Sequence, residues 1–296
     1  MRIVLIFVDG LGLGVEDPVK NPCARKGLKL LACFENGSGV VHMDGGGVLV
    51  PTEATLGVEG LPQSATGQTT ILTGINCSKL LGRHLQGYPN ETLRELLREH
   101  SILKSVKMLG LRAAFINAYR PLFFKLKEKT QWRLSTTTVA NLSAGLPFFL
   151  IEDIRQGRSI YHDFTNESLI ARGFDVPRFS PEDAARVLAH ISREFDFILY
   201  EYFLTDRAGH CQDMKRAFGE IEKLERFLSA LLDGVNLDES LIILTSDHGN
   251  IEDLSVKTHT RNRVPTLLWG RSAVEVKDRI RAIEDIAPAI LGILGE

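Results

Sequence analysis

Short runs of apolar, often β-branched residues recur along the chain, and stretches whose apolar positions repeat with a helical period separate several of them. The short runs are typical of buried strands, whereas the longer period is typical of helices that bury one face. Strands are predicted at residues 3–8, 112–117, 197–202, 240–246 and 264–270. Because strands and helices alternate, we expect an α/β fold with a mostly parallel sheet covered on both faces.

Three helical segments have clear signals. Residues 92–109 carry a stripe of leucines that is interrupted near Ser101. Ser180, followed by Pro-Glu-Asp, predicts a helix start, with Ser as the cap and the acids in the first turn. This helix should run to about residue 195. Residues 213–232 repeat their apolar positions with the period of an amphipathic helix.

The middle of the chain differs from its two ends. Residues 119–178 have no clean period and mix basic, hydroxylated and aromatic side chains. We expect a small cap there, inserted into a core formed by residues 1–118 and 179–296. Its basic run includes Lys125 and Lys127. The run is either a solvated surface or a rim that binds an anionic substrate, with both lysines as substrate contacts.

Composition and charge narrow the class of protein. Of the 296 residues, 44% are apolar and 24% are charged, as in an ordinary globular protein. The 35 Lys and Arg residues nearly balance the 37 Asp and Glu residues, giving a net charge of −2. This balance gives no electrostatic reason to expect nucleic acid as a partner. The oligomeric state cannot be predicted from these features.

The expected setting is cytoplasmic. The apolar run at residues 3–8 is too short to span a bilayer, and the Asp9-Gly10 that follows it is no signal-peptidase site. We therefore expect no association with a membrane. The 4 cysteines are scattered and form no CxxC pair, which favours a reduced compartment.

Acids and histidines gather where the predicted strands end or begin. Ligands of open parallel sheets collect at the carboxyl ends of the strands. The residues in such positions are Asp9, Asp206, His210, Asp247, His248 and His259, the last just before the strand at residue 264. Each one alone could belong to a turn or to the start of a helix, but all of them together indicate a metal centre.

The residue types indicate which metals to expect. Mixed carboxylate and imidazole ligands suit Zn²⁺, Mn²⁺ or Fe²⁺, whereas Mg²⁺ and Ca²⁺ prefer oxygen ligands only. Six ligands are too many for one catalytic ion that keeps an open position, and about right for two ions. Two divalent ions, Mn²⁺ or Zn²⁺, are therefore the predicted cofactors.

Hydroxylated residues precede a helical run at residues 61–74. Ser64 and Thr66 both lie where a helix N-terminus would favour an incoming anion. Either a plain N-cap or a nucleophile fits this position. A metal neighbour would turn such a hydroxyl into an alkoxide nucleophile.

Three motifs resemble the alkaline phosphatase superfamily, and within it the branch of cofactor-independent phosphoglycerate mutase and phosphopentomutase. They are Thr-Ser-Asp-His-Gly-Asn-Ile-Glu at residues 245–252, Asp-Arg-Ala-Gly-His at residues 206–210, and His259-Thr260 leading to Val264-Pro265. The resemblance covers residues 1–118 and 179–296. It implies a three-layer α/β/α sandwich of the alkaline phosphatase type.

The resemblance also implies how the side chains divide. One metal ion would be held by Asp206, His210 and His259. The second would be held by Asp9, Asp247 and His248, with Ser64 beside it as nucleophile and ligand. Ser64, rather than Thr66, matches the family's nucleophile by its offset to Thr73-Gly74. Further expected substrate contacts are Thr66, Asn250, Arg261 and Arg263.

Two departures separate this chain from the mutase. Ala-Thr-Gly-Gln follows Ser64, where the mutase has a Glu-Val-Gly-His type of sequence. Only residues 119–178 are available for a cap, whereas the mutase has a large inserted domain. We therefore expect a phosphatase or phosphodiesterase that acts on a small phosphorylated metabolite through a phosphoserine. The alternatives are a phosphomutase and a non-catalytic metal-binding protein that retains the fold.

Overall fold

The computed structural model describes residues 1–35, 41–43 and 46–295. Within these residues seven strands form one sheet in the order β2-β3-β7-β6-β1-β5-β4. The strands are β1 (Arg2–Val8), β2 (Val41–His42), β3 (Val48–Thr52), β4 (Ala113–Phe115), β5 (Phe197–Tyr202), β6 (Ser240–Ser246) and β7 (Val264–Gly270).

The sheet is mixed, with a parallel centre. β6, β1, β5 and β4 are mutually parallel, which confirms the expected mostly parallel sheet. β7 runs antiparallel to β6, β3 antiparallel to β7, and β2 antiparallel to β3. β3 therefore points the same way as the four central strands, and only β7 and β2 point the other way.

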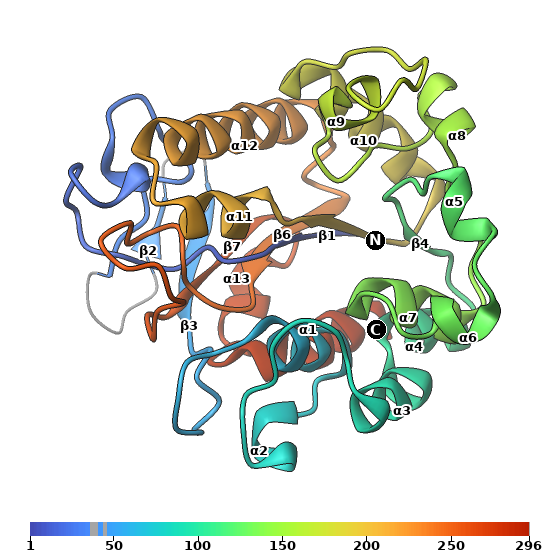
Figure 1. Ribbon diagram of the computed structural model, residues 1–296, viewed down its shortest axis with the longest axis horizontal. Coiled ribbons are helices and arrows are strands. Elements are labelled where there is room, and N and C mark those ends of the chain that lie inside the picture. Colours follow the sequence, from blue (N-terminus) through green and yellow to red (C-terminus); the bar gives the residue numbers. More distant parts are fainter. Residues whose placement is uncertain (36–40, 44–45, 296) are drawn as a thin grey trace.

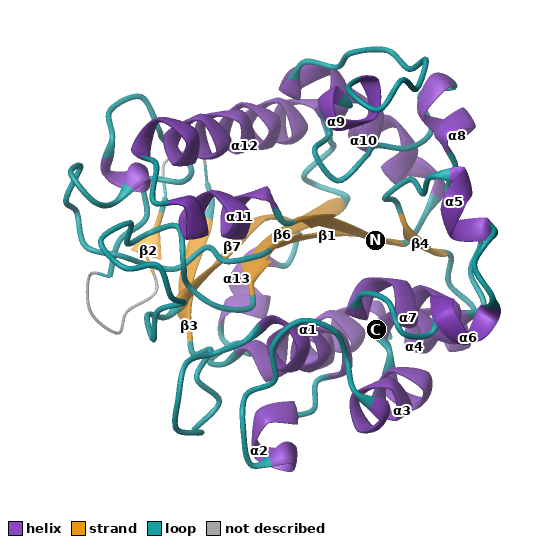
Figure 2. Cartoon of the chain, in the orientation of Figure 1, coloured by secondary structure: helices purple, strands orange, loops and turns teal. Residues whose placement is uncertain are grey.

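Helices cover both faces of the sheet, as Figures 1 and 2 show with the sheet nearly edge-on between them. The helices are α1 (Ser64–Thr73), α2 (Cys77–Leu81), α3 (Glu91–His100), α4 (Ile102–Met108), α5 (Pro121–Phe124), α6 (Glu128–Gln131), α7 (Thr136–Ala144), α8 (Ile151–Arg155), α9 (Glu167–Ile170), α10 (Pro181–Ile191), α11 (Leu204–Cys211), α12 (Met214–Gly234), α13 (Ala273–Lys277) and α14 (Ile286–Leu294). The long α12 lies on one side of the sheet and α1 on the other (Figure 1).

Alternate residues of β1 belong to two separate hydrophobic clusters. Val4, Ile6 and Val8 pack with side chains of α10 and α12. Ile3, Leu5 and Phe7 pack with side chains of α1, α3, α4, α7 and α14. Successive residues of a strand point to opposite faces, so the sheet is the middle layer of a three-layer sandwich. This confirms the expected fold class.

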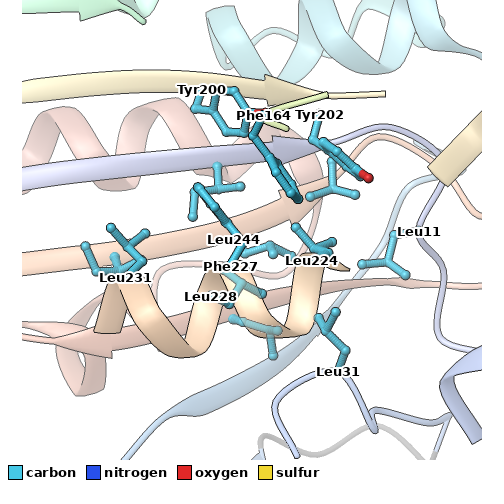
Figure 3. Packing of buried hydrophobic residues seen from close by; sticks show 14 of the residues in the cluster. Leu11, Leu31, Phe164, Tyr200, Tyr202, Leu224, Phe227, Leu228, Leu231 and Leu244 are labelled. Atoms are coloured by element: carbon cyan, nitrogen blue, oxygen red, sulfur yellow. The ribbon is translucent and has the colours of Figure 1, made fainter. Parts of the chain in front are cut away.

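Figure 3 shows the packing between α12 and the sheet. Leu224, Phe227, Leu228 and Leu231 project from one face of α12, as the helical period predicted. The ring of Phe227 stacks on that of Phe164, with 4.8 Å between the ring centroids. These buried side chains fix α12 above the strands that position the site.

The helix signals are confirmed, although α10 ends at Ile191 and a 3-10 turn continues it to Glu194. The predicted interruption near Ser101 separates α3 from α4, and Ser101 has an extended ψ of 129°. Ser180 caps α10 by accepting a hydrogen bond from the Asp183 backbone N–H. The Asp183 carboxylate in turn accepts the backbone N–H of Ser180, which completes a capping box.

Residues 119–178 lie along the β4 edge of the sheet. α7 contacts α3 and α4, and its Val139 is buried in the same cluster as Ile3. α8 and α9 instead contribute Ile151, Ile154 and Leu169 to a separate small cluster. That this segment is a substrate-selecting cap stays a prediction. Among the described residues, no helix combines the length and apolar character needed to cross a bilayer.

Candidate functional site

The ends of three central strands meet at one edge of the sheet. Val8, the last residue of β1, lies opposite Tyr202 of β5 and Ser246 of β6. Asp9 and Asp247 follow directly and therefore emerge side by side. α11 begins just after β5 and carries Asp206 and His210 one turn apart.

His259 reaches this edge because β7 is antiparallel to β6. An antiparallel neighbour begins where the central strands end, so the residues that precede β7 lie over the same edge. A backbone bridge between Gly249 and Thr260 ties the loop after β6 to the loop before β7. The structure thus brings all six predicted Asp and His ligands to one place.

Asp9, Asp247 and His248 form the first group of candidate ligands. His248 Nε2 lies 3.3 Å from Asp9 Oδ1 and 3.5 Å from Asp247 Oδ2. Both of these carboxylate oxygens are buried and have no hydrogen-bond partner. Two unpartnered buried oxygens that face one imidazole nitrogen leave a polar gap that suits a cation.

Asp206, His210 and His259 form a second group. His259 Nε2 lies 3.5 Å from Asp206 Oδ1 and 3.3 Å from His210 Nε2, and His210 Nε2 lies 3.4 Å from Asp206 Oδ2. His210 Nδ1 is 2.8 Å from the Lys257 carbonyl oxygen, and His259 Nδ1 is 2.8 Å from that of Pro62. Carbonyl oxygens only accept, so each Nδ1 must carry the proton and donate it. The Nε2 lone pairs are then free to face Asp206, as in metal-binding histidines.

Burial and like charges perturb the titration of these groups strongly. Burial raises the pKa of Asp247 to about 8, and the negative charge of Asp206 is the second cause of this rise. Burial and then the Asp247 charge raise the pKa of Asp9 well above its usual value. Burial also lowers the pKa of His248 to about 3, which keeps its imidazole neutral. Protein groups alone do not compensate these carboxylates, and bound cations would.

Two sets of side chains have ligand atoms close enough together to hold an ion: Asp9, Asp247 and His248 in one, and Asp206, His248 and His259 in the other. His248 belongs to both sets. His210 contacts Asp206 and His259 from the outer side. The residues present therefore fit two divalent ions, in a donor set of carboxylates and imidazoles.

α1 brings Ser64 to the first group of ligands. Ser64 is the first residue of α1, and its Oγ lies 3.1 Å from His248 Nε2. Gln68, one turn later, donates from Nε2 to Asp9 Oδ2 over 3.1 Å. Between them, Gly67 lets the helix approach Asp247, since a Cβ at Gly67 would lie 2.9 Å from Asp247 Cβ. This close approach is what holds the Ser64 hydroxyl at the centre.

Thr66 and Asn250 lie near the centre but are fully buried. The Thr66 hydroxyl donates to the Gln63 carbonyl and accepts the backbone N–H of Leu85. Asn250 donates from Nδ2 to Asp206 Oδ1 over 2.6 Å. In this structure both side chains therefore bind protein groups, and Asn250 orients a candidate ligand.

The four expected basic contacts lie outside the cavity over Ser64. Arg261 is exposed and donates to the Gly60 carbonyl, and Arg263 forms an ion pair with Glu35. Lys125 and Lys127 are exposed. The cavity measures about 260 Å³, and its lining includes Asp9, Ser64, Asp206 and Arg207.

Sequence reasoning missed three residues of this region. Arg207 directly follows Asp206 and lines the cavity. Glu201 is buried within β5 and accepts a 2.7 Å hydrogen bond from Thr137 Oγ1. A carboxylate in an otherwise apolar strand was a signal that could have revealed it. Gln68 has no comparable signal, because its spacing of four from Ser64 places it on the same helix face but does not show that Asp9 is its partner.

Glu252 joins the loops that carry the ligands. Its carboxylate accepts the backbone N–H of Gly12 over 3.1 Å and of Asn250 over 2.7 Å. The same carboxylate accepts hydrogen bonds from Thr260 and from Asn262, the latter over 3.0 Å. One buried side chain thus connects the segments that follow β1 and β6 with the segment that precedes β7.

Comparisons with known proteins agree with this arrangement. Residues 165–295 match the family described as the Metalloenzyme superfamily. A 2,3-bisphosphoglycerate-independent phosphoglycerate mutase of Desulforudis audaxviator (strain MP104C) is 30% identical over 133 residues, which cover 40% of this chain and 26% of the mutase. The chain thus matches only about a quarter of that relative's length.

Two solved structures share the fold over nearly the whole chain. A protein from Pyrococcus horikoshii is 16% identical, with a TM-score of 0.58 and coverage of 99% of this chain and 96% of its own. The alkaline phosphatase of the Antarctic bacterium TAB5 is 14% identical, with a TM-score of 0.57 and coverage of 99% and 98%. At such identities the likeness concerns the fold alone.

Proposed function

We propose that this chain, whose residues 165–295 match the Metalloenzyme superfamily, transfers phosphoryl groups through Ser64, as a phosphatase or phosphodiesterase of a small phosphorylated metabolite. One observation carries the proposal. The Ser64 hydroxyl lies 3.1 Å from His248 Nε2, beside two buried carboxylate oxygens without partners. A hydroxyl in such a place is suited to nucleophilic attack.

In the proposal, Asp9, Asp247 and His248 hold one divalent ion, and Asp206, His210 and His259 hold the other. Mn²⁺ and Zn²⁺ fit this donor set. When bound, the ions supply Lewis-acid stabilisation of phosphate oxygens and lower the pKa of the nucleophilic hydroxyl. Gln68 and Asn250 keep the ligands Asp9 and Asp206 in position through their hydrogen bonds.

Ser64 Oγ then attacks phosphorus in line with the leaving oxygen. The Ser64 hydroxyl gives its proton to solvent water as the new Oγ–P bond forms and the bond to the leaving oxygen breaks, and that oxygen takes a proton from water. Ser64 is the first residue of α1, so the positive end of the helix dipole would stabilise the negative charge of its phosphorylated side chain. Water next attacks the phosphoserine, which releases phosphate and restores the hydroxyl.

Arg207 is our candidate for the first contact with the anionic substrate. It is exposed and lines the same cavity as Ser64. An arginine there attracts phosphate over a distance and can bind two of its oxygens. Arg261 and Arg263 are bound to Gly60 and Glu35 in this structure, so a role for either in binding would require those contacts to break.

A phosphomutase is the second candidate, favoured by the match to a phosphoglycerate mutase. Both reactions would share the phosphoserine and differ in its acceptor, which is water in one and a substrate hydroxyl in the other. The acceptor therefore decides between them. With 3-phosphoglycerate, a phosphatase releases inorganic phosphate, whereas a mutase forms 2-phosphoglycerate.

The experiment is a turnover assay of protein loaded with Mn²⁺ or Zn²⁺. The substrates are phosphomonoesters, phosphodiesters and 3-phosphoglycerate, and mass spectrometry of acid-quenched protein locates the bound phosphate. We expect phosphate on Ser64, and a loss of at least about a hundredfold in kcat for Ser64→Ala. Ser143→Ala is a matched control, because Ser143 is also half-buried and helical but donates to the Val139 carbonyl.

Two outcomes contradict the proposal. One is phosphate trapped on a residue other than Ser64, such as Thr66. The other is near-normal turnover by Ser64→Ala under conditions in which Ser143→Ala is fully active. A complete lack of turnover across the substrate panel, in protein shown to contain metal, would favour the non-catalytic alternative.

A further inference from the structure

We propose that a second cavity, next to Ser64, is a subsite for an apolar, preferably aromatic, group of the substrate. The proposal rests on the proposed function, since it names the class of phosphate ester that the same centre would accept. The group bonded to the phosphate would occupy this cavity while the phosphate itself lies over Ser64.

The second cavity measures about 340 Å³. That volume is within the range of roughly 300–1,000 Å³ found for small-molecule sites. Tyr88, Ser135, Glu201 and Phe203 line both this cavity and the one over Ser64. The two spaces are therefore neighbours with shared walls, and one ligand can extend across both.

The walls of the second cavity are largely apolar. Phe115 of β4, Phe123 of α5, Leu126 and Leu134 contribute side chains to it. The ring of Tyr119 packs 4.5 Å from that of Phe123 and 6.2 Å from that of Phe115, centroid to centroid. A wall of packed rings offers aromatic ligands edge-to-face contacts in addition to burial.

The charged side chains of the lining are Arg120 and Glu201. Glu201 is bound to Thr137 and is 8% exposed. Burial raises its pKa to about 7, so this carboxyl is partly protonated near neutral pH. A polyhydroxylated sugar would need many hydrogen-bond partners, but the polar groups of Asn117, Tyr119 and Thr138 in this lining already bind protein groups. An apolar ring or branched alkyl group needs few.

The lysines of the basic run do not take part in this cavity. Lys125 and Lys127 are absent from its lining, whereas Leu122, Phe123 and Leu126 from the same stretch are present. The segment at residues 119–138 thus turns apolar residues toward the cavity and lysines toward solvent. Leu122 is 62% exposed and Tyr88 is 65% exposed, so apolar surface continues from the cavity into solvent.

The test measures equilibrium binding of non-hydrolysable phosphonates by calorimetry, with protein loaded with Mn²⁺ or Zn²⁺. Methylphosphonate probes the phosphate position alone, and 2-naphthylphosphonate probes both spaces. We expect the naphthyl compound to bind at least about tenfold more tightly, from the apolar area that it buries. Leu126→Trp should remove most of that advantage by filling the cavity, while methylphosphonate binding stays within about twofold of the wild-type value.

Leu150→Trp is the matched control, because Leu150 belongs to the same segment, is 42% exposed and is not part of the lining. It should keep the wild-type ratio of affinities. A wild-type ratio near one would overturn the proposal, and so would an equal loss in both variants. Naphthyl selectivity without turnover of any ester would leave the subsite standing and contradict the proposed function. Turnover of esters without naphthyl selectivity would leave the proposed function standing and contradict the subsite.

Discussion

Glu201 is a buried carboxyl group. The side chain that donates a hydrogen bond to it is the neutral hydroxyl of Thr137. Burial raises its pKa from 4.5 to about 7. The folded protein therefore holds this proton more tightly than the unfolded chain does. The resulting stabilisation is complete below about pH 4.5 and is lost as the pH rises through about 7.

Glu201→Gln should remove this dependence, because glutamine resembles the protonated acid and can still accept the hydrogen bond from Thr137. Both proteins are compared without metal. As the pH rises from 5 to 8, the unfolding free energy of the wild type should fall by up to about 3 kcal/mol relative to that of the variant. Urea unfolding at both pH values measures the change. Glu95→Gln, an exposed substitution on α3, is the control. An equal pH dependence in wild type and Glu201→Gln would contradict this account.

At the residue scale, the sequence revealed the candidate ligands because strand ends can be located from apolar runs. Asp9 and Asp247 directly follow such runs. The residues that hold these ligands in place were not visible, because Gln68 and Glu252 become neighbours of Asp9 and the loops only through folding. Short polar side chains on a helix or in a loop have no sequence pattern that reports a distant partner.

Gly67 controls how closely α1 approaches the centre. An added Cβ at Gly67 would lie 2.9 Å from Asp247 Cβ and 3.0 Å from its carbonyl oxygen. Gly67→Ala should therefore displace the start of α1 and move Ser64 away from His248, with a loss of about tenfold or more in kcat/KM. A phosphate-release assay measures this loss.

Gly219→Ala is the control for Gly67→Ala. Gly219 is also helical, on α12, and a Cβ there would meet nothing within 4 Å. This variant should keep full activity and gain up to about 1 kcal/mol in unfolding free energy from its better helix propensity. Equal activity in both variants would show that the approach of α1 to Asp247 does not matter.

Glu225 ties the loop at residues 29–31 to α12. Its carboxylate accepts the backbone N–H groups of Lys29, Leu30 and Leu31 over 2.7, 2.9 and 2.9 Å. Glu225→Gln replaces an acceptor by an amide donor and should cost about 1–3 kcal/mol of unfolding free energy. Glu222→Gln, exposed on the same helix, should cost little. Urea unfolding compares the two, and similar losses would contradict the role of Glu225.

At the element scale, the central strands could be predicted but part of the sheet could not. The apolar run of strand β3 ends after three residues at Pro51, which has no N–H to donate to a ladder, whereas in β7 the apolar run continues after its proline. The direction of β7 has no local signal either. A parallel β7 would begin at the opposite edge and carry His259 away from Asp206, so this ligand depends on a pairing that only tertiary packing determines.

The whole molecule should depend on bound metal for stability. Three buried or half-buried carboxylates, Asp9, Asp206 and Asp247, lie close to one another, and burial makes their charges costly. Chelation should lower the Tm. Protein with free metal at a hundred times its Kd should have an unfolding free energy about 2.7 kcal/mol higher than the chelated protein. Asp247→Asn should show a smaller difference between metal-loaded and chelated protein. An unchanged Tm after complete metal removal would contradict a metal centre at these residues.

The position of β1 has a consequence for synthesis on the ribosome. β1 is made before its two neighbours in the sheet, β5 and β6, which begin at Phe197 and Ser240. Pairings so distant in sequence form late and slow folding. The apolar run of β1 must therefore remain unpaired on the nascent chain until most of the protein has been translated. During that interval it is exposed to aggregation and is a natural binding segment for chaperones.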